Sequence, residues 1–210
     1  MSKNKNNKKR SLIQYAIFGV IAMALYATGL HTEVIGFAQR GLLETGMMDP
    51  VVDEGKEIAQ VRPSEGSPAN ETANKPKADF SLQLKDENGK IVSLSKFKGK
   101  VIFINIWATW CPPCVAEMPG IDELHQEMDG EVAFVMLSVD QYFETAKSFK
   151  ERKNYELPIY ALAGNLPAMY QSSAIPTTFV IDAEGNLALT HKGMADYNSD
   201  KFKKFLRGLK

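Results

Sequence analysis

The chain has 210 residues, of which 25 are basic and 25 acidic, so its formal net charge at neutral pH is zero. This length suits one domain of ordinary size with additional segments. Residues 1–32 hold five basic residues and no acidic one, which leaves 20 basic against 25 acidic residues in the remainder. A mildly acidic body of this kind gives no indication of nucleic-acid binding, and we expect none.

The first 30 residues predict a membrane anchor. A basic tail, residues 1–11, precedes an uncharged apolar run of 19 residues, 12–30. A helix of this length spans about 28 Å, close to the ~30 Å hydrocarbon core of a bilayer. The basic residues should remain in the cytoplasm, which places the rest of the chain outside it. A cleaved signal peptide is the alternative, with a weak site at residues 22–24, but the apolar run continues beyond that point.

Residues 31–77 are predicted to connect this anchor to the body. The apolar residues within 31–48 fit two interpretations: a short amphipathic helix near the membrane or a partner, or a continuation without a role of its own. Residues 49–77 collect Pro, Gly, Ser, Asn, Glu and Lys without periodicity, which predicts a flexible linker.

Residues 78–210 alternate between strand and helix patterns and are predicted to form one α/β domain. A β-hairpin that turns at Asn88-Gly89 opens it, and a second hairpin followed by a helix closes it. We expect strands at 80–84, 91–94, 101–107, 132–139, 157–162, 177–181 and 187–191, and helices at 111–128, 142–153, 166–171 and 199–209. This order predicts a central mixed sheet with helices on both faces.

Cys111 and Cys114 lie where the buried strand 101–107 gives way to a helix. Unpaired N–H groups in the first helical turn would stabilise a thiolate at Cys111, whose pKa we expect below the free value of roughly 8.5. Pro112 and Pro113 suit that turn. We expect Cys111 to face solvent and attack, and Cys114 to resolve. A structural pair or zinc ligands are the alternative, but the chain has no further cysteine and its three histidines are scattered.

The run from Asn105 to Pro119, with Trp-Cys-Pro-Pro-Cys at its centre, resembles the TlpA/ResA-like branch of the thioredoxin superfamily. A second motif, residues 174–182, is similar to the cis-proline loop of that family. The resemblance covers roughly residues 78–210. It implies a thioredoxin-like fold in which 142–162 form a helix–strand insertion, and a membrane-anchored thiol–disulfide oxidoreductase outside the bacterial cytoplasm that uses a cysteine pair and no cofactor or metal.

The resemblance also implies roles for individual residues. Glu117 matches a glutamate of this branch and is assigned the proton-handling role, because Asn105 stands where thioredoxin has a buried Asp. A solvated helix glutamate is the competing interpretation. The bond between Ile175 and Pro176 is expected to be cis, against an ordinary trans turn, and to expose the Ile175 backbone to an extended substrate. Trp110, beside Pro112 and Pro113, is expected to shape the docking surface, whereas Trp107 is assigned to the core.

The function expected from these features is reduction of disulfides in exported proteins, for example apocytochrome c. The resemblance implies a CcdA- or DsbD-like transmembrane electron donor and a location in the bacterial cytoplasmic membrane, with the catalytic domain in the periplasm. Three alternatives are weaker: a disulfide-inserting oxidase, a peroxiredoxin-type peroxidase, whose motif does not fit around Cys111, and an anchored copper chaperone that would need a third ligand such as His191.

Overall fold

The computed structural model describes residues 3–27, 30–43, 50 and 75–210. The predicted linker, residues 49–77, lies outside the described residues except for residue 50 and residues 75–77. The described residues form a seven-stranded sheet in the order β2-β1-β5-β4-β3-β6-β7. Its strands are β1 (Gln83–Lys85), β2 (Ile91–Ser93), β3 (Val101–Trp107), β4 (Val132–Ser138), β5 (Ile159–Leu162), β6 (Thr177–Ile181) and β7 (Leu187–Lys192).

The sheet is mixed, as predicted. β3 pairs in parallel with β4, and β4 with β5, whereas the β1–β2, β1–β5, β3–β6 and β6–β7 pairs are antiparallel. The predicted N-terminal hairpin is β1–β2, and the predicted insertion is the helix α4 (Phe143–Lys153) followed by β5. All seven residues of β3 are buried, as the apolar residues at six of its seven positions indicate.

The helices of the body do not cover the two faces of the sheet equally. The side chains of Val101, Phe103 and Trp107 on β3 pack in one core with residues of α3 (Pro112–Glu127), α4 and α5 (Asp200–Arg207). Ile102, Ile104 and Ile106 pack in a second core on the opposite face. There the cover comes from the 3-10 helices η1 (Leu94–Phe97) and η2 (Ala168–Tyr170) and from irregular segments. The expectation of helices on both faces therefore needs correction, because β3, β4 and β5 follow one another in one direction, which places both crossover helices on the same side.

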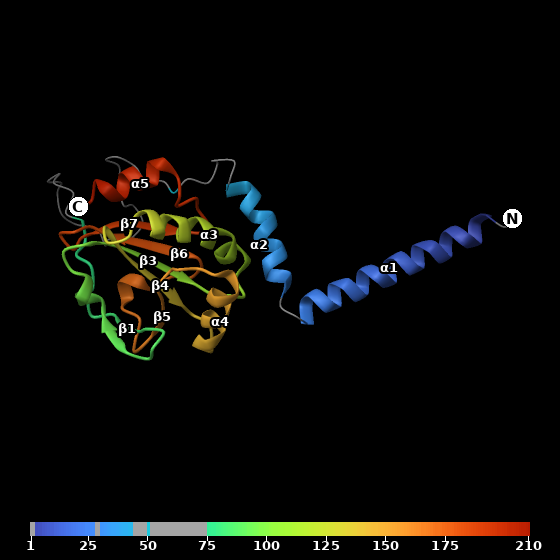
Figure 1. Ribbon diagram of the computed structural model, residues 1–210, viewed down its shortest axis with the longest axis horizontal. Coiled ribbons are helices and arrows are strands. Elements are labelled where there is room, and N and C mark those ends of the chain that lie inside the picture. Colours follow the sequence, from blue (N-terminus) through green and yellow to red (C-terminus); the bar gives the residue numbers. More distant parts are fainter. Residues whose placement is uncertain (1–2, 28–29, 44–49, 51–74) are drawn as a thin grey trace, which may run out of the picture.

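Two helices precede the body. α1 (Lys3–Ala27) includes most of the predicted tail and anchor and projects away from the sheet, whereas α2 (Leu30–Leu43) lies against α3 (Figure 1). Among the described residues, no helix is both long enough and apolar enough to cross a bilayer. Residues 28–29 of the predicted anchor and 44–48 of the predicted amphipathic segment lie outside the described residues.

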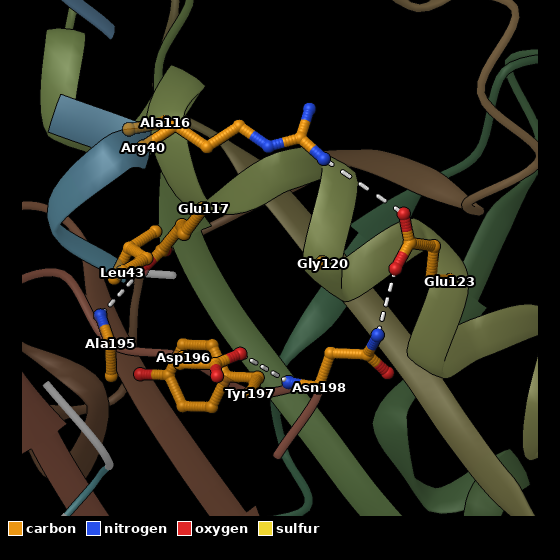
Figure 2. Close-up of a pocket in the computed structure, with 10 residues that line it drawn as sticks. All are labelled: Arg40, Leu43, Ala116, Glu117, Gly120, Glu123, Ala195, Asp196, Tyr197 and Asn198. Carbon is orange, nitrogen blue, oxygen red and sulfur yellow. Dashed lines mark hydrogen bonds and ion pairs between the residues drawn. The ribbon is translucent and has the colours of Figure 1, made fainter. Parts of the chain in front are cut away.

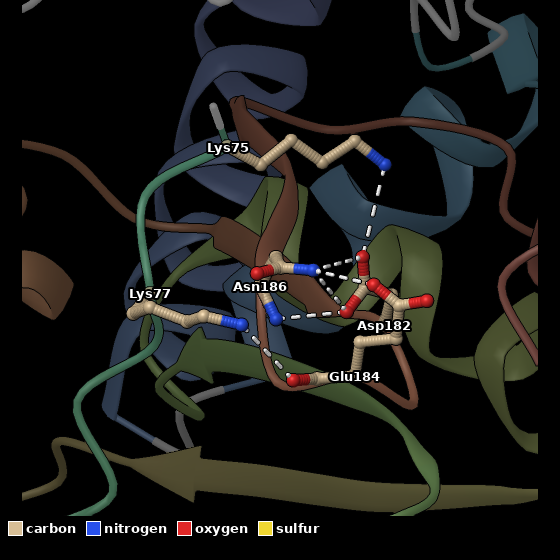
Figure 3. A network of polar contacts seen from close by, with 5 residues as sticks. All are labelled: Lys75, Lys77, Asp182, Glu184 and Asn186. Atoms are coloured by element: carbon tan, nitrogen blue, oxygen red, sulfur yellow. Dashed lines mark hydrogen bonds and ion pairs between the residues drawn. The ribbon is translucent and has the colours of Figure 1, made fainter. Parts of the chain in front are cut away.

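The chain enters the body at the turn between β6 and β7 (Figure 3). Lys77 forms a β-bridge with Asn186, and Lys75 lies 3.7 Å from the Asp182 carboxylate. Asp182 also accepts hydrogen bonds from the backbone and side-chain amides of Asn186. Because Ile181 pairs with Ile102 at the start of β3, this entry point lies at the opposite end of β3 from the cysteines.

Candidate active site

The two cysteines lie at the junction of β3 and α3. Cys111 is the N-cap residue of α3, in an extended conformation, and its Sγ accepts a hydrogen bond from the Cys114 N–H at 3.3 Å. Pro112 and Pro113 occupy the first two helical positions, where a missing N–H leaves no bond unmade. Sγ of Cys111 therefore lies at the positive end of the α3 dipole, a position that stabilises a thiolate after the pair is reduced.

The cysteines form a disulfide, with their Cα atoms 5.3 Å apart. Cys114 is fully buried, and only 4% of the Cys111 surface is exposed. The expectation that Cys111 faces solvent is thus wrong for this oxidised form, although Cys111 remains the more accessible of the two. Its sulfur lies 3.8 Å from the carbonyl oxygen of Ile175, so the neighbouring loop covers it.

The predicted cis-proline loop faces the disulfide. The peptide bond between Ile175 and Pro176 is cis, as predicted, and Pro176 is buried directly before β6. Trp110 is 58% exposed beside Cys111, whereas Trp107 is completely buried in the core, also as predicted. The structure thus brings Trp110, Ile175 and Cys111 to one side of the domain, at the carboxyl end of β3.

Glu117 is buried, contrary to the alternative of a solvated helix residue. Only 2% of its surface is exposed. Its carboxylate accepts hydrogen bonds from the Asn105 side-chain amide at 2.8 Å and from the Ala195 N–H at 3.3 Å. Burial raises the pKa of Glu117 to about 8, and these two hydrogen bonds oppose the rise. Because Glu117 follows Cys114 by three residues on α3, the two lie on nearly the same face of the helix.

Asn105 has a clearer role than the sequence indicated. It occupies the middle of β3 on the face that meets α3, and its side-chain amide donates both to Glu117 and to the hydroxyl of Thr178 on β6, the latter at 2.9 Å. An amide donor at this position holds the Glu117 carboxyl in place. The pattern of a polar residue within an otherwise apolar buried strand was visible, but its partner could not be read from the local sequence.

Asp140 is a site residue that sequence reasoning missed. Its carboxylate accepts hydrogen bonds from the N–H and hydroxyl of Thr109 and from the hydroxyl of Ser138. It thereby ties the end of β4 to the turn that presents Cys111. The available signal was the position of Asp140, directly after a buried strand that neighbours β3. Within the described residues, no group of three or more His, Cys, Asp or Glu side chains is arranged to hold a metal ion.

Fold and site together define a thioredoxin-like domain with a cysteine pair at a helix N-terminus, opposite a cis-proline loop. The Redoxin family model matches residues 69–205, and the chain belongs to that family.

Relatives of this chain include the thiol-disulfide oxidoreductase ResA of Bacillus thuringiensis subsp. konkukian, 34% identical over 110 residues, which cover 51% of this chain and 64% of ResA. The thioredoxin-like protein YneN of Bacillus subtilis is 33% identical over 118 residues, 55% of this chain and 68% of YneN. The chain thus spans slightly less than two thirds of the length of ResA.

Solved structures agree on the fold. A thiol:disulfide interchange protein of the thioredoxin family from Chlorobium tepidum superposes with a TM-score of 0.54 and 26% identity, over 64% of this chain and 97% of the other. The exposed lipoprotein thioredoxin Etrx1 of Streptococcus pneumoniae gives a TM-score of 0.53 and 29% identity, over 61% and 98%.

Proposed function

We propose that this chain is a membrane-anchored thiol–disulfide oxidoreductase that reduces disulfides in exported proteins. The observation that carries the proposal is the Cys111–Cys114 pair at the N-terminus of α3, with the buried carboxyl of Glu117 one turn further along. The relatives that are named thiol-disulfide oxidoreductases support the same activity.

The reaction moves two electrons from the dithiol to the substrate. The Cys111 thiolate attacks one sulfur of the substrate disulfide, forms a mixed disulfide and releases a substrate thiolate. Cys114 then loses its proton to the Glu117 carboxylate and attacks the Cys111 sulfur. This second step forms the Cys111–Cys114 disulfide and releases the other substrate thiolate. Glu117 suits the role, because a pKa of about 8 lets it accept and return a proton near neutral pH.

A substrate segment would dock between Trp110 and the cis-proline loop. Trp110 offers an exposed aromatic surface next to Cys111, and Ile175 is only partly buried, with its carbonyl oxygen near the Cys111 sulfur. An extended peptide that pairs with the Ile175 backbone would bring its own disulfide within reach of Cys111. Apocytochrome c, with two haem-binding cysteines, is the substrate that we propose.

Electrons must reach this site from the cytoplasm. We propose that residues 12–30 anchor the chain in the bacterial cytoplasmic membrane, with the N-terminus inside and the redox domain in the periplasm. A CcdA- or DsbD-like membrane protein would re-reduce the disulfide. The face of α2 that points away from α3 suits a place at the membrane surface, because Val34 and Phe37 are exposed there, Phe37 by 79%.

The exchange mechanism is tested by Cys114→Ser in the full-length chain. Without the resolving thiol, the mixed disulfide between Cys111 and the substrate persists, and we expect adducts that a reducing agent releases. Cys111→Ser/Cys114→Ser is the control and should yield none. Failure to recover any adduct from cells that produce the Cys114→Ser variant would contradict the mechanism.

The direction of electron flow is tested by the redox state of the pair in cells, after acid quenching and thiol alkylation. For a reductase with a working donor, we expect Cys111 and Cys114 to be mostly reduced, and to become oxidised when the donor is deleted. A mostly oxidised pair with an oxidising equilibrium potential against glutathione would instead identify a disulfide-inserting enzyme.

A further inference from the structure

Helix α2 packs against the first turn of the active-site helix. A Cβ atom at Gly36 would lie 3.2 Å from the carbonyl oxygen of Pro112 and 3.2 Å from Cγ1 of Val115. The two helices can therefore approach this closely only because residue 36 lacks a side chain. α2 thus touches the segment between the two cysteines.

Ion pairs fix α2 in this position. The Glu33 carboxylate accepts a hydrogen bond from Lys153 at 2.6 Å and lies 3.6 Å from Arg152, both at the end of α4. The hydrogen bond from Lys153 is the main reason why the pKa of Glu33 is lowered. Nearer the other end of α2, Arg40 lies 4.0 Å from Glu123 of α3. α2 is held by charges on two different helices of the body.

Beneath α2 lies a cavity of about 240 Å³ that reaches Glu117 (Figure 2). It lies between α2, α3 and the segment between β7 and α5, and it is partly open to solvent. Its lining comprises Arg40, Leu43, Ala116, Glu117, Gly120, Glu123, Ala195, Asp196, Tyr197 and Asn198. Leu43 is 93% buried against the body. A polar cavity of this size has room for several water molecules.

A buried proton acceptor needs a route to solvent. Under the proposed function Glu117 takes a proton from Cys114 when the disulfide forms, and it can return that proton when the pair is reduced again. Between these steps its charge state follows the solvent pH only where protons can pass between the carboxyl and bulk solvent. Its carboxylate is covered by Asn105 on one side and by the Ala195 backbone on another. The cavity under α2 is lined by both Glu117 and Ala195, which makes it the candidate path for protons between Glu117 and bulk solvent.

We propose that α2 is a functional part of the redox site. It covers the cavity through which Glu117 exchanges its proton, and it thereby sets the pH range in which turnover occurs. The inference rests on the proposed function of Glu117. Gly36 is then a positioning residue, because it affects Glu117 only through the position of α2 against α3.

The direction of the effect follows from the groups around Glu117. The charged and titratable groups that line the cavity with Glu117 are Arg40 of α2, Glu123 of α3, and Asp196 and Tyr197 of the segment between β7 and α5, and the cysteines lie on its own helix. Burial is the largest influence on Glu117. Displacement of α2 would hydrate the Glu117 carboxyl, which lowers its pKa. Loss of Arg40 would raise that pKa, but by less, because Glu123 already offsets the charge of Arg40. The pH midpoint of turnover should therefore move to lower pH.

The test compares Gly36→Val with Gly41→Val in the full-length chain, reconstituted in lipid nanodiscs. Both changes carry the same penalty for valine in a helix, but a Cβ at Gly41 meets nothing within 4 Å. The measurement is the rate of disulfide exchange between pH 5 and pH 10, with trypsin cleavage after Arg40 as the measure of α2 displacement. We expect Gly36→Val to move the midpoint down by about one pH unit or more, and Gly41→Val to leave it in place.

Two further variants separate the possible failures. Where Gly36→Val alone leaves Arg40 protected from trypsin, Glu33→Lys/Gly36→Val adds repulsion from Lys153 and Arg152 and releases α2. A released α2 with an unchanged midpoint overturns the inference. Gly36→Val/Glu117→Gln should behave as Glu117→Gln alone, and an additional shift in that double variant would also overturn it. If Glu117→Gln itself leaves the profile of the otherwise unchanged chain intact, the proposed function of Glu117 fails instead.

Discussion

At the level of single residues, Glu117 couples the stability of the domain to pH. Its pKa is about 8 in the folded protein, against an ordinary value of 4.5. A carboxyl with a raised folded pKa stabilises the fold fully below pH ~4.5, and that stabilisation is lost as the pH rises through about 8. Each pKa unit corresponds to about 1.4 kcal/mol, so the total loss is several kcal/mol in order of magnitude.

We therefore expect Glu117→Gln to make the oxidised protein more stable than the parent at pH 9. The amide leaves one of the two hydrogen bonds unmade, a penalty of about 1 kcal/mol, which is smaller than the cost of burying the charge. Denaturant unfolding at pH 5, 7 and 9 measures the effect. Glu151→Gln, an exposed change on α4, should follow the parent at every pH. An equal pH dependence in Glu117→Gln and the parent would contradict a raised pKa.

The same substitution should slow catalysis. Without a carboxylate to take the Cys114 proton, we expect the resolving step at pH 7 to be at least about tenfold slower, because a positioned base contributes about 10²–10⁴-fold when it is ionised. The rate should also lose its inflection near pH 8, while circular dichroism shows an intact fold. Stopped-flow exchange with a model disulfide over a range of pH provides both readouts.

At the level of elements, the turn between β3 and α3 depends on a residue from the neighbouring strand. We expect Asp140→Ala to lower the free energy of unfolding by about 1–3 kcal/mol, because Thr109 and Ser138 lose their shared acceptor. Asp140→Asn keeps one acceptor oxygen and should recover much of the loss. Thermal unfolding of the three proteins tests the order. Equal melting temperatures for the parent and Asp140→Ala would show that the turn holds its shape without Asp140.

The elements themselves were largely predictable. The strands 101–107 and 177–181 agree with β3 and β6 at both ends, because short runs rich in apolar and β-branched residues between turn residues mark buried strands. The predicted helix 166–171 is instead the 3-10 turn η2, of three residues, since so short a segment has little local preference. The cis bond before Pro176 was predicted from a motif, whereas Thr178 lies 73 residues from Asn105 and Thr109 lies 31 residues from Asp140, so these two contacts leave no local trace.

At the level of the whole molecule, the sequence could not reveal where α2 lies. Its apolar residues were compatible with contact to a membrane, contact to a partner, or no role. A helical period shows that one face of a helix is apolar, but it does not show which surface that face contacts. The contact of Gly36 with Pro112 joins segments 76 residues apart in the chain. Residues of α2 line the same cavity as Glu117, and the choice between a buried and a solvated glutamate needed the assembled structure.

The order of the helices places the redox pair close to the proposed anchor. α2 begins at Leu30, three residues after α1 ends, and its 14 residues span about 21 Å along the surface of α3. Because α2 seats Gly36 on the first turn of α3, an anchor at residues 12–30 would hold the Cys111–Cys114 disulfide near the bilayer surface. A donor embedded in the same membrane would then meet the disulfide at a high effective concentration.

Release from the membrane should therefore leave the pair oxidised. We expect a chain whose residues 12–30 are replaced by a cleavable export signal to accumulate outside the cytoplasm with Cys111 and Cys114 mostly disulfide-bonded, as alkylation after acid quenching will show. The matched control replaces 12–30 by an unrelated uncharged apolar run of equal length and should remain mostly reduced. A released domain that is as reduced as the anchored control would mean that a soluble donor serves this site, because a membrane-embedded one reaches a diffusing domain far less often.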